Sequence, residues 1–420
     1  MRMGIKNVYR LSFAGAVMML SSCDTSSDVK IDNQVDPPPV QIEVSARDRS
    51  DIDQYNSFGF DFVKPMLSED GNVVFSPLSL QMVLSMLANG DNEAVAEALV
   101  GKLSSGTGPE ALDNLNELSQ RLLKNLPLVD RKASVKVTNS IWCDATYDFT
   151  KEFADMCGLY YQAESHKYNA GTIEGMKKIN DWCEDKTNGM ISDYYTDPPC
   201  DDAILINCLY FHGEWREPFD SKLTAKAPFY TPGGEEISVD MMHTTDYCVV
   251  GKENEEVVEL TLSYGNQGYY MTLLMPKNFD NFVECVDKYF NSGRSDSAYE
   301  YSQGISWDKE GLVKLSMPRF EMQSDFDLVD RLREMLGMEC LEDETIYNIL
   351  EGRGIHVNGV KQKSAIKVDE QGTVASAVTS VGSVYGFVKN FNVTIDRPFF
   401  YAIQENSTGA VLFMGKVSQP

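Results

Sequence analysis

The most informative stretch of the 420-residue chain is residues 370–387, which read Glu-Gln-Gly-Thr-Val-Ala-Ser-Ala-Val-Thr-Ser-Val-Gly-Ser-Val-Tyr-Gly-Phe. Between Gln371 and Val388 there is no charged residue and no proline, although 24% of the chain is charged. Small and β-branched residues fill the first half of this stretch, and such residues suit a half-buried β-strand. The composition therefore predicts a segment that is able to become a strand.

Alternation gives this segment one face of small side chains. Successive side chains of a strand point to opposite sides, so one face would carry Thr373, Ala375, Ala377 and Thr379. A face this small fits into an existing core without overpacking it. Gly372 and the glycines that follow instead favour a loop. The two signals together predict a loop that inserts into a sheet when it is triggered.

The flanks of the stretch carry recognisable motifs. Upstream, residues 360–370 read Val-Lys-Gln-Lys-Ser-Ala-Ile-Lys-Val-Asp-Glu; downstream, residues 396–403 read Asp-Arg-Pro-Phe-Phe-Tyr-Ala-Ile and residues 409–417 read Gly-Ala-Val-Leu-Phe-Met-Gly-Lys-Val. This order resembles the serpin family: a Glu-x-Gly-Thr hinge, small residues, a variable loop, then Arg-Pro-Phe and Phe-Met-Gly. The alternative is an ordinary flexible loop between two strands.

Other segments match the same family in order. Residues 75–79 read Phe-Ser-Pro-Leu-Ser and open a predicted helix, in which Ser76 is a good N-cap and Pro77 suits the first helical position. A further helix is predicted over residues 172–186, and the apolar run 203–211 predicts a central strand buried on both faces. The resemblance covers residues 52–417. It implies one serpin domain, 51–420, of the α+β class, with a large mixed central sheet, two further sheets, about eight or nine helices and an exposed reactive-centre loop.

Serpins are suicide inhibitors of proteases, so the resemblance implies a mechanism. The exposed loop is cleaved, acylates the protease and inserts as a strand into the main sheet, which traps the protease. Insertion would begin at a hinge formed by Glu370, Gly372, Thr373, Val374, Ala375, Ser376 and Ala377.

The resemblance also implies two polar sites in the main sheet. A shutter beneath its centre would contain Ser76, Ser79, Asn207 and Gln362; the family usually has His at the last position. A breach near its top would contain Trp215 and Arg319. Arg319 is expected to pair with Glu370 at the surface, where an ion pair contributes little to stability.

The scissile bond is placed by counting along the loop. Counting forward from the hinge gives the Gly386–Phe387 bond, whereas counting back from Pro398 gives cleavage after Phe387. Tyr385 precedes both candidate bonds, and residues 385–387 contain no Arg or Lys. Because substrate pockets select by shape and burial, elastase-, chymotrypsin- or papain-like proteases are expected as targets, and trypsin is not. The partner is therefore a serine protease or a cysteine protease.

The N-terminus carries an export pattern. Arg2, Lys6 and Arg10 precede or border an apolar run over residues 11–20, and Leu-Ser-Ser-Cys ending at Cys23 resembles a bacterial lipobox. The pattern predicts a lipoprotein signal peptide over 1–22 and a lipid-anchored flexible tether over 23–50, rich in Asp, Ser and Pro. The expected location is the bacterial cell envelope, periplasmic or surface-exposed. A plain secretory signal with a chance cysteine is the alternative.

Charge and motif content argue against other classes. A net charge of -26 disfavours nucleic acid as a partner. The four histidines form no HExxH motif, and no GxSxG elbow occurs. The sequence therefore indicates a protein that is not an enzyme, with no metal and no cofactor, expected to be a monomer.

Eight cysteines follow Cys23 without a CxxC pair, and their apolar settings favour buried thiols over disulfides.

The functional alternative to an inhibitor is a non-inhibitory serpin that acts as a binding or chaperone module. The small hinge residues favour inhibition.

Overall fold

The structure, a computed structural model, describes residues 37–90, 92–291, 307–336, 347–355, 360–372 and 390–420. Eight α-helices lie in these residues: α1 (Ala46–Val63), α2 (Pro77–Ala88), α3 (Glu93–Leu103), α4 (Gly108–Asn125), α5 (Lys151–Tyr161), α6 (Ile173–Lys186), α7 (Phe282–Val286) and α8 (Val329–Leu336). Shorter turns are η1 (Met66–Ser68), η2 (Leu126–Leu128), η3 (Phe279–Asn281) and η4 (Asp287–Asn291). No helix in these ranges combines the length and apolar character needed to cross a membrane.

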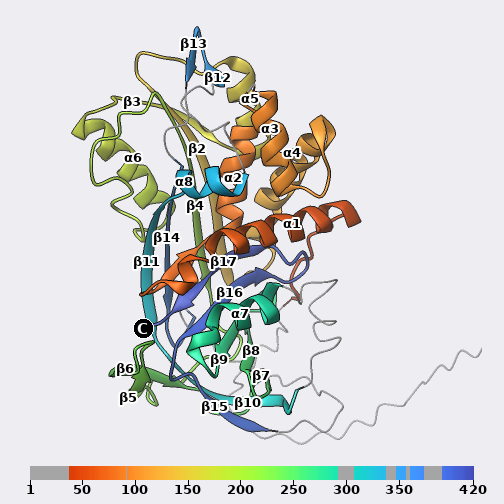
Figure 1. Ribbon diagram of the computed structural model, residues 1–420, viewed down its shortest axis with the longest axis vertical. Coiled ribbons are helices and arrows are strands. Elements are labelled where there is room, and N and C mark those ends of the chain that lie inside the picture. The colour runs from red at the N-terminus through yellow and green to blue at the C-terminus, as the bar shows by residue number, and fades with distance from the viewer. Residues whose placement is uncertain (1–36, 91, 292–306, 337–346, 356–359, 373–389) are drawn as a thin grey trace, which may run out of the picture. The chain divides into compact units, whose positions relative to one another are not determined.

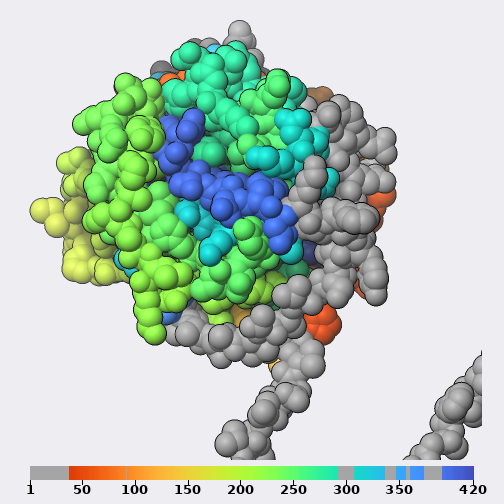
Figure 2. Space-filling view, turned by 90° about the horizontal axis from the view of Figure 1, so that it is seen from below, coloured from red at the N-terminus to blue at the C-terminus, as the bar shows by residue number. Residues whose placement is uncertain are grey.

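Ten strands form the largest sheet. They are β1 (Val73–Phe75), β5 (Ala225–Tyr230), β6 (Glu236–His243), β7 (Val249–Glu253), β8 (Val257–Tyr264), β9 (Tyr269–Pro276), β10 (Lys309–Pro318), β15 (Phe391–Thr394), β16 (Phe399–Glu405) and β17 (Val411–Val417). Their order is β1-β17-β16-β9-β8-β7-β10-β6-β5, and β15 joins β10 in parallel. Figure 2 shows the consequence: the last part of the chain, in blue, lies between green and cyan segments from much earlier.

The remaining strands form smaller sheets. β2 (Ala133–Asp144), β3 (Glu164–Tyr168) and β4 (Ala203–Gly213) pair in the order β3-β2-β4. β11 (Phe320–Asp327) pairs with β14 (Lys361–Val368), and β12 (Tyr347–Leu350) pairs with β13 (Arg353–Ile355). Figure 1 shows α3, α4 and α5 grouped on one side of β2 and α6 on the other.

The first turn of α2 follows directly from its sequence. The Ser76 hydroxyl accepts a hydrogen bond from the Ser79 N–H (3.1 Å), and Pro77 occupies the first turn, where it breaks no helical hydrogen bond. Eleven of the twelve residues of the helix are buried, so the helix runs through the core rather than over it. The buried helix therefore holds its N-cap residue, Ser76, next to β14.

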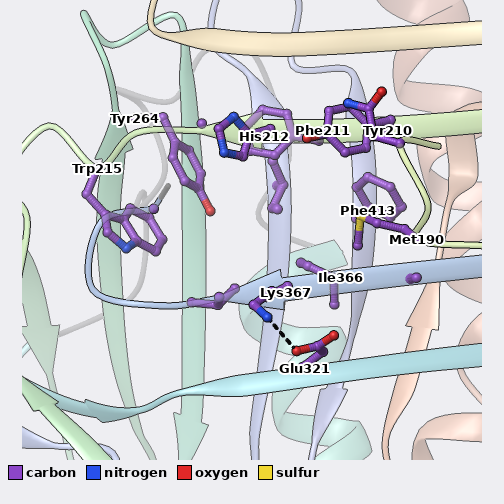
Figure 3. Close-up of a pocket in the computed structure, with 16 residues that line it drawn as sticks. Met190, Tyr210, Phe211, His212, Trp215, Tyr264, Glu321, Ile366, Lys367 and Phe413 are labelled. Carbon is purple, nitrogen blue, oxygen red and sulfur yellow. Dashed lines mark hydrogen bonds and ion pairs between the residues drawn. The ribbon is translucent and has the colours of Figure 1, made fainter. Parts of the chain in front are cut away.

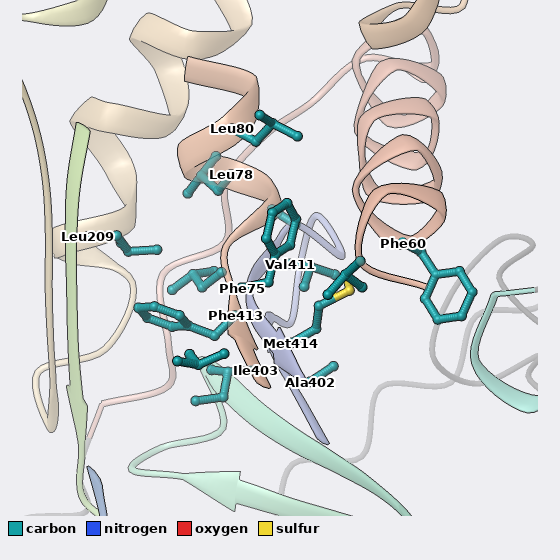
Figure 4. Packing of buried hydrophobic residues seen from close by; sticks show 14 of the residues in the cluster. Phe60, Phe75, Leu78, Leu80, Leu209, Ala402, Ile403, Val411, Phe413 and Met414 are labelled. Atoms are coloured by element: carbon teal, nitrogen blue, oxygen red, sulfur yellow. The ribbon is translucent and has the colours of Figure 1, made fainter. Parts of the chain in front are cut away.

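The core lies between the large sheet, α1, α2 and β4 (Figure 4). The side chains labelled there belong to these elements and are at most 7% exposed: Phe60, Phe75, Leu78, Leu80, Leu209, Ala402, Ile403, Val411, Phe413 and Met414. Full burial of a large apolar side chain contributes about 1.5–3 kcal/mol. The interior is therefore sufficient to hold the two edges of β4 and β14 in place without a ladder between them.

The predicted α+β class is confirmed, and eight α-helices in the described ranges agree with the expected eight or nine. The run 203–211 was predicted to be a central strand buried on both faces. Burial on both faces holds for its middle, residues 206–209. The central position does not hold, because β4 pairs with β2 alone among the described strands. Its side chains at Tyr210, Phe211 and His212 are only partly buried.

Folded contacts begin before the predicted start of the folded domain at residue 51. Val40 donates its N–H to the Val129 carbonyl (2.8 Å), and Ile42 is buried. α1 begins at Ala46 because Ser45 and Asp48 form a reciprocal capping box. The folded contacts therefore begin near residue 40, about ten residues before the predicted boundary at 50.

The prediction of free thiols agrees with the structure. Seven of the eight cysteines after Cys23 lie in described residues, and none of these seven is in a disulfide. Five are buried, Cys248 is partly buried and Cys200 is exposed. Burial raises the pKa of the Cys285 thiol to about 12, so such thiols are unreactive.

Candidate functional site

β4 and β14 are neighbours without a ladder between them, and we call this unpaired seam the gap. Their Cα atoms come within 8 Å at some positions, so the two strands must move apart before a third strand, which needs about 9–10 Å between its neighbours, fits between them. Within the described residues, β4 is paired only with β2 and β14 only with β11. The two strands run in the same direction, because their first residues line one hollow and their last residues line another. A chain that turned back between them would run antiparallel to both, which is the geometry of a regular antiparallel ladder.

The two hollows mark the two ends of the gap. The upper one, about 200 Å³, is lined by Gly213 and Trp215 after β4 and by Ala365 and Val368 on β14. Figure 3 shows its aromatic wall and the ion pair of Lys367 with Glu321 on the opposite side. The lower one, about 520 Å³, is more polar and is lined by residues at the starts of both strands.

Gly372 closes the upper end of the gap. Its φ of +70° lies in the left-handed region, which favours glycine. A Cβ atom here would lie 2.3 Å from the Gly213 carbonyl oxygen and 2.4 Å from the Trp215 nitrogen. The Trp215 N–H also donates to the Gln371 carbonyl (3.0 Å). The chain that leaves β14 is thus held against the end of β4 at a residue that only glycine can fill.

Trp215 also holds the junction between the end of β4 and the chain that leaves β14. Its indole stacks on Tyr264, with ring centroids 4.3 Å apart and an interplanar angle of 13°. The indole Nε1–H donates to the Asp369 carbonyl (2.9 Å), so it also holds the end of β14. Trp215 thus lies just after β4 and contacts both the end of β14 and Tyr264, and Tyr264 was not predicted.

The Arg319–Glu370 pair is present, but it is not the surface pair that was expected. Arg319 Nε lies 2.8 Å from each carboxylate oxygen of Glu370, and Thr224 donates its hydroxyl to the same group. The Glu370 side chain is only 5% exposed, whereas that of Arg319 is 44% exposed. Burial alone would raise the pKa of Glu370, but the hydrogen bonds from Arg319 and Thr224 outweigh burial and lower it. The prediction was wrong on burial because Thr224 and the main chain of Phe219, whose N–H donates to the Glu370 carbonyl (2.9 Å), cover this residue.

The shutter residues Ser76, Ser79 and Gln362 form one connected group. Gln362 Oε1 accepts from the Ser76 N–H (3.0 Å), and its Nε2 donates to the Ser76 carbonyl (2.9 Å). Gln362 is 7% exposed. The amide thus satisfies both main-chain groups of one residue and ties β14 to the start of α2.

Asn207 has a different partner from the one implied. Its Nδ2 donates to Asn139 Oδ1 (2.8 Å), directly across the β2–β4 ladder. Its own Oδ1 is buried and, among the described residues, has no hydrogen-bond partner. Asn139 was missed, although a lone Asn among the β-branched and apolar residues of what is now β2 was a usable signal.

The chain after α6 contacts β14 as well. Tyr194 donates its hydroxyl to the Lys361 carbonyl (2.9 Å), and Lys363 Nζ donates to Asp193 Oδ1 (2.8 Å). The Lys363 side chain is 5% exposed. These contacts tie the connection between α6 and β4 to the far side of the gap, and the sequence held no signal for them.

Several predicted residues lie outside the described part of the chain. They are Cys23, the hinge residues Thr373, Val374, Ala375, Ser376 and Ala377, and the reactive-site residues Tyr385, Gly386 and Phe387.

Comparison with known proteins agrees with this geometry. Residues 53–420 match the family described as "Serpin (serine protease inhibitor)". Serpin B6 of Bos taurus is 30% identical over 367 residues, which cover 83% of this chain and 93% of that protein. A serine protease inhibitor of Cyanea capillata is 27% identical, with 83% and 92% covered. The structure of the Arabidopsis serpin in its native stressed conformation aligns with a TM-score of 0.74 at 24% identity, covering 90% of this chain and all of that one.

Proposed function

Because the chain belongs to the serpin family, whose members are generally protease inhibitors, we propose that it is a suicide inhibitor that traps a protease by loop insertion. The observation that carries the proposal is the gap between β4 and β14, with Gly372 at its upper end. Insertion of the cleaved loop as a strand is the established mode of inhibition in this family.

The chemistry begins at the Gly386–Phe387 bond. The protease nucleophile adds to the Gly386 carbonyl carbon, the amide bond breaks, and Phe387 leaves with a new amino terminus. Gly386 is then esterified to the protease. The freed segment from Thr373 onward is able to turn at Gly372 and enter the gap.

The energy of insertion comes from the ladder that is missing before cleavage. A strand beside the eight residues of β14 makes on the order of ten new backbone hydrogen bonds. At about 0.5–1.5 kcal/mol net for each bond, the gain is about 5–15 kcal/mol. This is comparable to the whole stability of a typical domain, so insertion is able to drag an attached protease.

The targets follow from the aromatic and glycine residues around the bond. Tyr385 and Phe387 suit a hydrophobic primary pocket, and Gly386 suits a shallow one. We infer that elastase-, chymotrypsin- or papain-like proteases are inhibited and that trypsin is not.

Covalent complex formation tests the proposal. The protein is incubated with one protease of each class, and the products are separated on a denaturing gel. We expect a one-to-one complex that survives SDS with at least one of them. Thr373→Arg is the matched control: its charge would be buried without a partner, so this variant should be cleaved without forming the complex. Reversible inhibition with an intact loop would contradict the mechanism.

We also propose that Cys23 carries a lipid that anchors the protein in a bacterial cell envelope. The lipobox-like sequence before Cys23 supports this, and the composition of the residues that follow, rich in Asp, Ser and Pro, suits a flexible tether. Cys23→Ala should move the protein from the membrane fraction to the soluble fraction. A variant that stays in the membrane would contradict the lipid.

A further inference from the structure

A hollow of about 330 Å³ lies on one face of β7, β8 and β9 (their positions are labelled in Figure 1). The alternate residues Glu259, Thr261 and Ser263 of β8 line it, with Tyr270 and Thr272 of β9 beside them. Gln267 and Asn406, on two neighbouring turns, close one end. The lining is therefore rich in hydroxyl and amide groups, and the volume suits a small molecule.

Glu259 is the unusual member of this lining. It is only 6% exposed, and its Oε2 has no hydrogen-bond partner among the described residues. A buried carboxylate without a partner is costly, and native proteins rarely leave one unexplained. Burial raises the pKa of Glu259 to about 7, although the charge of Lys252 acts in the opposite direction.

The nearest cation, Lys252, lines the same hollow and lies directly opposite Glu259 in the β7–β8 ladder, but among the described residues no ion pair joins the two side chains. Lys252 on β7 lies 5.6 Å from the centre of the Trp307 ring and 4.0 Å from a carboxylate oxygen of Glu310 on β10. Across the other edge of β8, the residue opposite Glu259 is the uncharged Leu274. Two carboxylates thus face one lysine, and the local charge balance is negative.

We propose that this hollow binds a small primary amine, whose ammonium group pairs with Glu259 while the surrounding hydroxyl and amide groups hold its polar remainder. A cation is favoured because a neutral polyol would leave the buried negative charge uncompensated. An anion in the hollow would meet the Glu259 carboxylate, whereas Lys252 already contacts Glu310 and the Trp307 ring. The site is separate from the gap between β4 and β14, so it does not depend on loop insertion.

Proton competition gives the site a characteristic pH dependence. An ammonium ligand favours the ionised carboxylate and therefore lowers the pKa of Glu259 when it binds. Conversely, protonation of Glu259 removes the ligand's partner, so affinity falls as the pH falls through the pKa. Between about pH 8 and about pH 6 the ionised fraction of a group with a pKa near 7 falls about tenfold, and the affinity should fall with it.

Calorimetric titration of the full chain with putrescine tests the proposal, and butanediol serves as a neutral ligand of the same length. We expect saturable binding of putrescine only, weaker at the lower pH. Glu259→Gln keeps the shape but removes the charge, and it should lose at least about tenfold in affinity. Glu321→Gln is the matched control, because this carboxylate lies on β11 and does not line the hollow, so this variant should bind as before.

Carbon-13 NMR of the carboxyl groups provides a second test that needs no variant with altered binding. The pKa of Glu259 should fall when putrescine is added. Absence of putrescine binding at the higher pH, equal binding by the Glu259→Gln variant, equal binding of butanediol or an unchanged Glu259 pKa would each overturn the proposal.

Discussion

Single side chains hold β14 in place before cleavage. Gln362 forms two hydrogen bonds with the main chain of Ser76, at the point where β14 meets α2. The Gln side chain is able to do this because its amide group donates and accepts at once. The family usually has His here, which offers one nitrogen to each side. The substitution therefore removes a titrating group from the shutter while it keeps the link.

Gln362→Ala should lower the free energy of unfolding by about 1–3 kcal/mol, because it leaves the buried Ser76 N–H without its acceptor. It also removes one of two hydrogen bonds to the Ser76 carbonyl, which still accepts from the Leu80 N–H (3.1 Å). Chemical denaturation followed by circular dichroism measures the change. Gln120→Ala is a suitable control: Gln120 also donates to a main-chain carbonyl (2.7 Å to Leu159), but at the surface. Its loss should change stability by less than about 0.5 kcal/mol. Equal effects of the two substitutions would contradict a structural role for Gln362.

Arg319→Ala removes the main partner of the buried Glu370 carboxylate. We expect a loss of about 1–3 kcal/mol at neutral pH, measured by thermal or chemical unfolding. Because the native pKa of Glu370 is lowered, the pair stabilises the fold above the ordinary glutamate pKa, and this contribution disappears as the pH falls through the lowered value. The wild-type advantage over Arg319→Ala should therefore shrink in acid.

Lys367→Ala is the control for this pair. Lys367 binds Glu321 (2.8 Å) nearby, but both side chains are more than half exposed. Such a pair contributes at most about 1 kcal/mol. If Lys367→Ala were as harmful as Arg319→Ala, burial of Glu370 would not be the cause.

At the scale of elements, the gap depends on how two strands end. β14 continues through Glu370 and Gln371 into Gly372, which lies against Gly213 at the end of β4. A side chain at this position would need both a positive φ and space that the main chain of β4 already fills. The turning point is therefore fixed by steric contact as well as by backbone preference.

Substitutions at Gly372 and Gly352 distinguish the effect of steric contact from the effect of backbone conformation. Gly372 and Gly352 have nearly the same φ, +70° and +69°, but a Cβ atom at Gly352 would meet nothing within 4 Å. Gly352→Ala should cost about 1–2 kcal/mol for the backbone alone. Gly372→Ala should cost clearly more and should displace the hinge, which limited proteolysis of the loop would report as faster cleavage. Equal losses of stability would mean that Gly372 does not lie against β4.

Elements that are specified by neighbouring residues could be predicted from the sequence. Ser76 and Pro77 mark the start of α2, and Thr172 caps α6, which begins at Ile173. The partners of a strand edge are not local, so the apolar run 203–211 could not show that β4 borders a gap. In the same way, Glu370 is buried by Thr224 and Phe219, which lie about 150 residues away in the chain. The pairing of Asn139 with Asn207 likewise depends on the register of β2 and β4.

At the scale of the whole molecule, the proposed mechanism requires an uncut chain that is not at its lowest free energy. The described part has two strands with unshared edges, a buried Asn207 oxygen without a partner, and a segment after Gly372 whose composition suits the space between them. Before cleavage, the loop is covalently joined to Gly372 at one end and to the residues before β15 at the other. These two connections restrain its entry into the gap between β4 and β14. Such a state persists for kinetic reasons and relaxes once the chain is cut.

Thermal unfolding of intact and loop-cleaved protein tests this claim most directly. Cleavage within residues 381–388 should raise the midpoint by at least about 10 °C, given the gain expected from a new central strand. The Thr373→Arg variant, cut at the same bond, should show little or no increase, because its charge would be buried during insertion. Equal midpoints for intact and cleaved wild-type protein would contradict insertion into the gap between β4 and β14.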